Sequence, residues 1–235
     1  MNGLLVRVGI DSTDGCWNAP MRLATGEFAY ITITDTKPAR DGLARHYDEF
    51  IPVVKRFGEQ LPPELLGTPT HLDPDFDRLT YGDQGQRGKR ISSTLIEGGL
   101  LAFFASLRPM DGPARPLIYA LIGLYVVEEI VLAKDIPKSR WAENAHTRRE
   151  PHDGEIVVRA KPGVSGRLRC CIPIGELREG MYRVRNDLLD AWGGLDITNG
   201  YIQRSAFLPA FRDAAKFHRW FNAQNTELVA ENNPE

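Results

Sequence analysis

The sequence predicts an α+β fold, built on a mixed, largely antiparallel sheet or a β-barrel with peripheral helices. Strand-like runs are spread along the whole chain and do not alternate regularly with helical segments, which disfavours a doubly wound sheet. Two apolar runs, residues 99–109 and 117–133, are joined by a short connection containing proline and glycine, so we expect an antiparallel pair at the sheet centre. Gly123 is expected to mark a bend or bulge in the second run.

Four other segments have strand patterns. Residues 4–10 are apolar on both faces, which is typical of an interior strand. Residues 28–35 alternate between apolar and polar side chains, as a half-buried strand does. Residues 155–160 and 167–174 flank the turn formers Lys161-Pro162-Gly163, and we expect them to form a hairpin.

Helical spacing is confined to short segments. It is found in residues 40–58, where Pro52 forces a break or a new first turn, in 186–192, and in 213–225 with Asp213 as a plausible N-cap. The intervening segments 59–90 and 134–154 are polar or rich in glycine and proline, and are expected to be loops. A loop as long as the first is usually functional or mobile in a compact domain.

Length and composition indicate one globular domain over residues 1–235, with 226–235 as a frayed polar tail. Hydrophobic residues make up 42% of the chain, which argues against disorder. The 29 Lys and Arg residues are balanced by 31 Asp and Glu residues, so the chain has no global attraction for nucleic acid. Binding to nucleic acid would therefore need a local basic face or a pocket.

The cysteines and the apolar runs predict a cytoplasmic protein without a membrane span. Cys16, Cys170 and Cys171 are an odd set with two adjacent members, which is a poor disulfide framework and indicates a reducing compartment. The N-terminal apolar run is too short and too soon charged for a signal peptide. Residues 117–133 contain two glutamates and lack the length of a membrane span, so they are interpreted as buried strand.

Standard catalytic motifs are missing from the sequence. It contains no Walker phosphate loop, no dinucleotide-binding glycine pattern after a strand, no zinc-protease HExxH, no nucleophile elbow and no paired CxxC. The enzyme classes that depend on these motifs are thereby disfavoured, and no cofactor is assigned.

The first candidate segment is DSTDGCWNAP, residues 11–20, directly after a predicted buried strand. Asp11, Ser12, Asp14 and Asn18 can hydrogen-bond the edge of a base, and Trp17 offers a stacking surface. The structural alternative is a well-satisfied turn whose tryptophan fills the core.

The second candidate segment is HLDPDFD, residues 71–77. Asp73, Asp75 and Asp77 are spaced like an oxygen-ligand loop, but the glycine and glutamate that an EF-hand requires further along are missing. We therefore expect a rigid turn that offers His71 and Asp73 to a site, and assign no metal. An Asx turn with no further role is the alternative.

The third candidate set consists of residues suited to phosphate or base contacts. Arginine binds phosphate and stacks on bases, although charged runs are often only solvated surface. The set is Tyr81, Arg87, Arg108, Arg148, Arg204 and Ser205, with His146 beside Arg148 as a further titratable group. Phe103, Phe104, Tyr119 and Tyr125 of the apolar pair are expected in the core and not on a stacking platform.

These segments together resemble the nucleotide modification associated domain 3 family nearly end to end. The matching stretches are VRVGIDSTDGCWNAP (6–20), FAYITITD (28–35), THLDPDF (70–76), the apolar pair (98–130), YIQRSAFLPAF (201–211) and KFHRWF (216–221). The resemblance implies a place in systems that modify nucleic-acid bases or recognise modified ones. The apolar pair is also similar to the core of PUA-like and EVE-like domains, which implies a PUA-like β-barrel with a base-binding pocket.

Two functional hypotheses follow. In the first, the protein is a binding module for DNA, RNA or a nucleotide with a modified base. Trp17 then stacks on the base, the polar side chains of residues 11–20 read its edge, and the arginines contact phosphate. In the second, the protein is an enzyme of the transferase or hydrolase type, with Asp11, His71, Asp73 and His146 as acid/base candidates or metal ligands.

A third hypothesis is a structural or regulatory partner among the proteins of a modification system, which a large exposed apolar patch would favour. The first two both require that the segments 11–20, 71–90 and 140–152 converge at one mouth of the folded protein.

Overall fold

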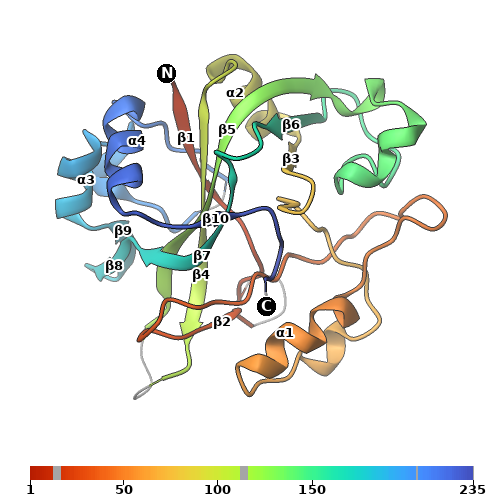
Figure 1. The fold of residues 1–235 in the computed structure, drawn as a ribbon, viewed down its shortest axis with the longest axis horizontal. Helices are drawn as coiled ribbons and strands as arrows, with labels where there is room; N and C mark the ends of the chain where they lie inside the picture. The colour runs from red at the N-terminus through yellow and green to blue at the C-terminus, as the bar shows by residue number, and fades with distance from the viewer. Residues whose placement is uncertain (13–16, 112–115, 205, 235) are drawn as a thin grey trace.

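The computed structural model describes residues 1–12, 17–111, 116–204 and 206–234. It has the expected α+β architecture, with a mixed, mostly antiparallel sheet whose path runs β1-β4-β5-β6-β3 (Figure 1). Strands β2, β7 and β10 attach to this path, and β8 and β9 form a separate pair. The strands are β1 (Gly3–Arg7), β2 (Pro20–Met21), β3 (Thr80–Asp83), β4 (Leu100–Pro109), β5 (Ile118–Leu132), β6 (Ile156–Ala160), β7 (Gly166–Pro173), β8 (Gly175–Arg178), β9 (Met181–Val184) and β10 (Leu228–Val229).

Strands β4 and β5 form the predicted antiparallel centre of the sheet. Their register runs from Leu100 opposite Val126 to Leu107 opposite Ile118, with a shift close to Gly123 as expected. A Cβ atom on Gly123 would lie 2.6 Å from the ring of Phe76, so a side chain there would displace that ring. Strand β1 pairs in parallel with β4, which makes the sheet mixed.

The prediction of a hairpin over residues 155–174 is wrong. Strand β6 pairs antiparallel with the second half of β5, and β7 pairs antiparallel with its first half. Both therefore run in the same direction along one long neighbour, joined by residues 161–165. Ser165 in this connection accepts a hydrogen bond from the amide of Val126, which fastens it to β5. Local turn formers were present, but they did not specify which strand would be the partner.

The sheet does not close into a PUA-like barrel. Its path ends at β1 on one side and at β3 on the other, and the described residues hold no pairing between these two strands. Strand β3 instead pairs antiparallel with β6 over Thr80–Asp83.

Two segments differ locally from their predictions. Residues 28–35 are extended and largely buried, but make isolated bridges such as Thr34 to Thr70 and form no continuous strand. Residues 59–90, expected to be a loop, contain β3 and the beginning of helix α2 (Gly85–Thr94). The helix was not predicted because its sequence is rich in glycine and charged residues, and only Gly88 and Ile91 form its buried face.

The other helices agree with their patterns. Helix α3 (Asn186–Trp192) ends at Gly193 with φ of 78°, and the Asp213 side chain accepts the Lys216 amide at 2.8 Å before α4 (Ala214–Ala223). Helix α1 (Ile51–Arg56) carries proline in its first turn. Short 3₁₀ helices span Tyr47–Phe50, Pro63–Leu65, Ala133–Asp135, Lys138–Glu143 and Thr198–Gly200. In the described part of the chain, no helix has both the length and the apolar character to cross a membrane.

The sheet separates two hydrophobic cores. Alternate residues of β4 face opposite sides, with Leu101 and Phe103 in the first core and Ala102 and Phe104 in the second. Helices α3 and α4 lie together over the second core, on the side of the sheet away from α1 (Figure 1). The apolar-pair aromatics Phe103, Phe104, Tyr119 and Tyr125 are buried, as expected.

The end of the chain is not frayed over its described residues. Strand β10 pairs antiparallel with β7. Beyond it, the Asn232 side chain donates to Asp75 at 3.0 Å and accepts the Phe76 amide at 2.8 Å. Asn233 exchanges two hydrogen bonds with the backbone of Tyr30, each of 2.8 Å. The polar composition of this segment serves to satisfy buried polar groups and not to solvate a tail.

Candidate functional site

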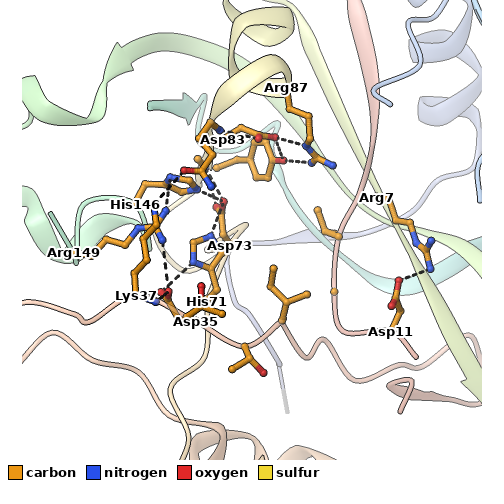
Figure 2. Close-up of a pocket in the computed structure, with 18 residues that line it drawn as sticks. Arg7, Asp11, Asp35, Lys37, His71, Asp73, Asp83, Arg87, His146 and Arg149 are labelled. Atoms are coloured by element: carbon orange, nitrogen blue, oxygen red, sulfur yellow. Dashed lines mark hydrogen bonds and ion pairs between the residues drawn. The ribbon is translucent and has the colours of Figure 1, made fainter. Parts of the chain in front are cut away.

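A cavity of about 420 Å³ opens beside β3, in the size range of small-ligand sites. Segments distant in the sequence surround it: the end of β1, the extended residues 33–37, the turn at 71–73, the junction of β3 with α2, and the loop 146–149 (Figure 2). Its lining residues are Arg7, Val8, Gly9, Asp11, Ile33, Thr34, Asp35, Thr36, Lys37, His71, Asp73, Tyr81, Gly82, Asp83, Gln84, Arg87, His146 and Arg149.

Two histidines and one aspartate meet in this pocket. Nε2 of His71 lies 4.0 Å from Oδ2 of Asp73, and Nε2 of His146 lies 3.7 Å from the same oxygen. One donor atom from each residue lies within 4.8 Å of the other two. The two imidazoles meet edge to face, with ring centroids 5.0 Å apart. We call these three residues the His–Asp–His centre.

Each imidazole is oriented by a second carboxylate on its other nitrogen. Nδ1 of His71 lies 3.1 Å from Oδ2 of Asp35, and Nδ1 of His146 lies 2.7 Å from Oε2 of Glu155 (Figure 2 labels the first of these pairs). When the Nδ1–H group of each ring donates to its carboxylate, Nε2 carries a lone pair and faces Asp73. The tautomer and the orientation of each ring are thereby fixed.

The protonation of the buried pair His146–Glu155 follows from its surroundings. Burial lowers the pKa of His146, although the hydrogen bond with Glu155 acts in the opposite direction. Burial raises the pKa of Glu155, but the hydrogen bond from His146 and the charges of His146 and Arg149 outweigh this effect and bring it to about 2. At neutral pH the carboxylate is therefore ionised, and burial favours the neutral form of the imidazole.

Asp73 is held in place from behind. The Gly82 amide donates to both of its oxygens, at 2.9 and 3.0 Å, and the Asn144 side chain donates to Oδ1 at 2.9 Å. Burial raises the pKa of Asp73 to about 7, although the charge of His71 and these hydrogen bonds oppose the shift. Asp73 thus exchanges between its two protonation states near neutral pH.

Gly82 is required by the geometry behind the centre. A Cβ atom at this position of β3 would lie 2.3 Å from Cδ2 of His146 and 2.6 Å from Oδ1 of Asn144. Both distances are shorter than any stable contact, so the imidazole and the amide occupy the space that a side chain would need.

The rest of the pocket alternates in charge. Its basic side chains are each paired with an acid, so the pocket is neither a purely basic nor a purely acidic cleft. The pairs are Arg7 with Asp11 at 2.7 Å, Arg87 with Asp83 at 2.9 Å, Lys37 with Glu155 at 3.2 Å, and Arg149 with Glu155 at 3.3 Å. The Arg7–Asp11 pair lies across the pocket from the His–Asp–His centre (Figure 2).

The structure brings several predicted site residues together. Of the four acid/base candidates, His71, Asp73 and His146 form the centre, and Asp11 lines the same pocket. Tyr81 and Arg87 also line it, joined by a hydrogen bond of 2.7 Å from the guanidinium to the phenol oxygen.

The other predicted residues lie elsewhere. Ser12 and Arg204 are exposed outside the lining, and Trp17 is partly buried against the first core. Asn18 donates to the carbonyl and hydroxyl oxygens of Ser106, and Arg108 pairs with Glu59. Arg148 is buried in an ion pair with Asp75. Asp14 and Ser205, together with Cys16, lie outside the described residues.

Several residues of the site were missed by the sequence reasoning. Asp35 and Glu155 orient the histidines, and Gly82 and Asn144 hold Asp73. Asp35 and Glu155 could have been recognised from their positions in the sequence. They lie at the ends of two segments with strand patterns, residues 28–35 and 155–160, where a charged side chain often faces a site. Nothing local marked Gly82 or Asn144.

One protein-family model matches this chain. It is described as nucleotide modification associated domain 3, and the match covers residues 2–196, including the whole His–Asp–His centre and the two carboxylates behind it. No curated protein and no solved structure matches the chain.

Proposed function

The chain belongs to the nucleotide modification associated domain 3 family, and from this premise we propose that it is an enzyme acting on a nucleotide or a nucleic-acid base bound in the 420 Å³ pocket. The observation that carries the proposal is the convergence of His71, Asp73 and His146 on one position of the pocket wall. The family name supports a nucleotide or a base as the substrate, and the His–Asp–His centre supports chemistry on it.

The arrangement of the centre favours catalysis over binding alone. A site that only recognises a base needs stacking surfaces and edge contacts. Trp17, the expected stacking residue, is not part of the lining, and Tyr81 is buried with its hydroxyl donating to Asp83 at 2.6 Å. Placing a partly buried and a buried imidazole, both oriented, around a buried carboxylate is costly and supports a chemical role. A water or hydroxyl group placed among the three donor atoms would be activated, as hydrolase or transferase chemistry requires.

The rim suits a ligand with both a polar edge and negative charge. Asp35 and Asp83 accept hydrogen bonds, as the amino groups of a base require, while Lys37 and Arg87 can face phosphate oxygens. Ile33 is 37% exposed at the pocket and offers an apolar surface for the face of a planar ring. DNA, RNA and free nucleotides all carry this chemistry, and the proposed partners also include other proteins of a modification system.

The test is a screen for binding and turnover. The intact protein is incubated with nucleoside monophosphates and with single- and double-stranded oligonucleotides bearing unmodified or modified bases. Affinity is measured at two salt concentrations and products by mass spectrometry. Asp73→Asn should abolish turnover and leave the fold intact. Asp187→Asn, which changes an exposed carboxylate paired with Arg185, is the matched control and should be neutral.

Binding without any chemical change of the ligand, at an affinity that Asp73→Asn does not alter, would contradict the proposal. Salt-sensitive binding would identify phosphate contacts.

A further inference from the structure

We infer that the His–Asp–His centre binds a divalent transition-metal ion. It offers two imidazole nitrogens and one carboxylate oxygen that point to a common position, with distances to the carboxylate oxygen of 3.7 and 4.0 Å. Ligands about 2.0–2.1 Å from a tetrahedral ion lie about 3.3 Å from one another. The three donor atoms all lie within 4.8 Å of one another, so the largest of their separations needs to close by at most about 1.5 Å to surround an ion.

The carboxylates on the far nitrogens provide a second, independent observation. Metal-binding histidines typically donate the other ring N–H to a carboxylate or a carbonyl, which fixes the tautomer and raises the basicity of the ligand nitrogen. Here both histidines have such a partner, Asp35 for His71 and Glu155 for His146. A single orienting carboxylate is common in cores, but a matched pair whose free nitrogens face one oxygen is the arrangement of a metal centre.

The hydrogen-bond inventory also calls for a cation. When the two rings donate their Nδ1–H groups to Asp35 and Glu155, each Nε2 is a hydrogen-bond acceptor. The Asp73 oxygen that both Nε2 atoms face is also an acceptor when the carboxyl is ionised. Three acceptors directed at one position repel one another unless a positive ion or a proton donor occupies it. The distances of 3.7 and 4.0 Å exceed a direct hydrogen bond from either ring to Asp73.

Local charge is consistent with a divalent ion. Asp35, Asp73 and Glu155 contribute three negative charges when ionised, and Lys37 and Arg149 contribute two positive ones. This part of the pocket is then negative by one charge without a metal and positive by one with it. A positive floor would attract a nucleotide phosphate or a developing oxyanion.

The donor set selects the class of metal. Magnesium and calcium prefer oxygen ligands, whereas imidazole suits zinc, iron, cobalt and copper. Three protein ligands leave at least one coordination position for water or substrate, which is typical of catalytic and not of structural sites. When bound, the ion would polarise a substrate oxygen or lower the pKa of a water molecule. Only this role of the ion, and not its binding, rests on the proposed function.

The test is a metal titration of the intact protein after chelation and desalting. Zn²⁺, Co²⁺, anaerobic Fe²⁺ and Mg²⁺ are titrated separately by calorimetry, and Co²⁺ is also followed by its visible absorption. We expect one Zn²⁺, Co²⁺ or Fe²⁺ ion per chain and no binding of Mg²⁺ in the same range. The relative affinities for Zn²⁺ and Fe²⁺ distinguish a hydrolytic from an iron-type centre.

Variants place the ion at the centre. His71 is partly buried and His146 is buried. His71→Ala and His146→Ala should each weaken metal binding at least about 100-fold, which is the largest loss typical of a group that only hydrogen-bonds a metal ligand. Glu155→Gln should weaken it about 10- to 100-fold by loosening His146. His152→Ala removes an exposed imidazole, is the matched control and should leave the affinity unchanged. Circular dichroism verifies that each variant is folded.

The inference is overturned if the folded protein takes up no transition metal stoichiometrically, if Mg²⁺ binds as tightly as Zn²⁺, or if His71→Ala retains the wild-type affinity. Nucleotide binding is measured in parallel on metal-free and on metal-loaded protein. Nucleotide binding without metal binding would overturn this inference alone, and metal binding without nucleotide binding in either form would overturn the proposed function alone.

Discussion

Glu155 holds His146 through a hydrogen bond of 2.7 Å between Oε2 and Nδ1, and both side chains are almost completely buried. Glu155 immediately precedes β6, and His146 lies in the loop that leads to this strand. It fixes which nitrogen of the imidazole is available to the pocket, because the other one is committed to the carboxylate. The geometry of the His–Asp–His centre thus depends on a residue that does not itself line the pocket.

The backbone of β3 should be intolerant of any side chain at Gly82. Gly82→Ala places a methyl group 2.3 Å from the His146 ring, so we expect a loss of about 1–3 kcal/mol in the free energy of unfolding and loss of ligand binding. Urea denaturation and the nucleotide screen measure the two effects. Gly42→Ala is the control, since a Cβ atom there meets nothing within 4 Å.

Gly42 has φ of 73°, so its replacement should cost about 1–2 kcal/mol through the backbone alone and leave binding intact. A Gly82→Ala protein that binds like wild type would mean that His146 can move away without consequence.

Arg148 should act through stability and not through phosphate. It is buried and forms an ion pair with Asp75, which is itself 1% exposed. Arg148→Met leaves that charge without its guanidinium, so we expect a loss of about 3–5 kcal/mol in unfolding free energy. The double variant with Asp75→Asn should recover part of this loss. Unchanged stability together with weakened oligonucleotide binding would restore the phosphate role expected from the sequence.

Trp17 should be dispensable for ligand binding. Stacking on a base contributes about 1–3 kcal/mol, so a stacking residue replaced by alanine reduces affinity by about 5- to 150-fold. Because Trp17 contacts the first core and does not line the pocket, we expect Trp17→Ala to lower the melting temperature and to leave nucleotide affinity within about twofold. A fall in affinity of tenfold or more in the folded variant would show that base stacking involves this residue.

The two adjacent cysteines should differ sharply in reactivity. Burial raises the pKa of the Cys171 thiol to about 12, whereas Cys170 is exposed on the other face of β7. Only the thiolate reacts with alkylating agents, so at pH 8 Cys171 has almost none of the reactive form. Iodoacetamide followed by peptide mapping should find Cys170 modified in the folded protein and both residues modified after denaturation. Equal modification in the folded state would contradict the burial of Cys171.

The parts of the fold that local patterns determine could be predicted from the sequence. The central pair is specified by two long apolar runs, and α3 and α4 by Gly193 and Asp213 at their ends. The hairpin over 155–174 was wrong because β5 is 15 residues long and accommodates two successive partners on one edge, which no local signal reveals.

The same distinction applies to the candidate site. His71 and Asp73 were recognisable because they are two residues apart in one turn. Their meeting with His146 could only be proposed, since it depends on how the loop before β6 crosses β3. Asp35 and Glu155 became visible only once the fold had placed them behind the histidines.

The last residues of the chain reach back to the turn that carries Asp73. Asn232 is bonded to Asp75 and Phe76, and Asn233 to Tyr30, although all of these contacts come from beyond residue 196, where the family match stops. A protein truncated to the matched region would lose these contacts of Asn232 and Asn233. It would also lose α4, whose Phe217 ring packs against Trp192. Truncated variants should therefore keep residues 197–234. A purification tag is better placed at the N-terminus than directly after the segment that carries Asn232 and Asn233.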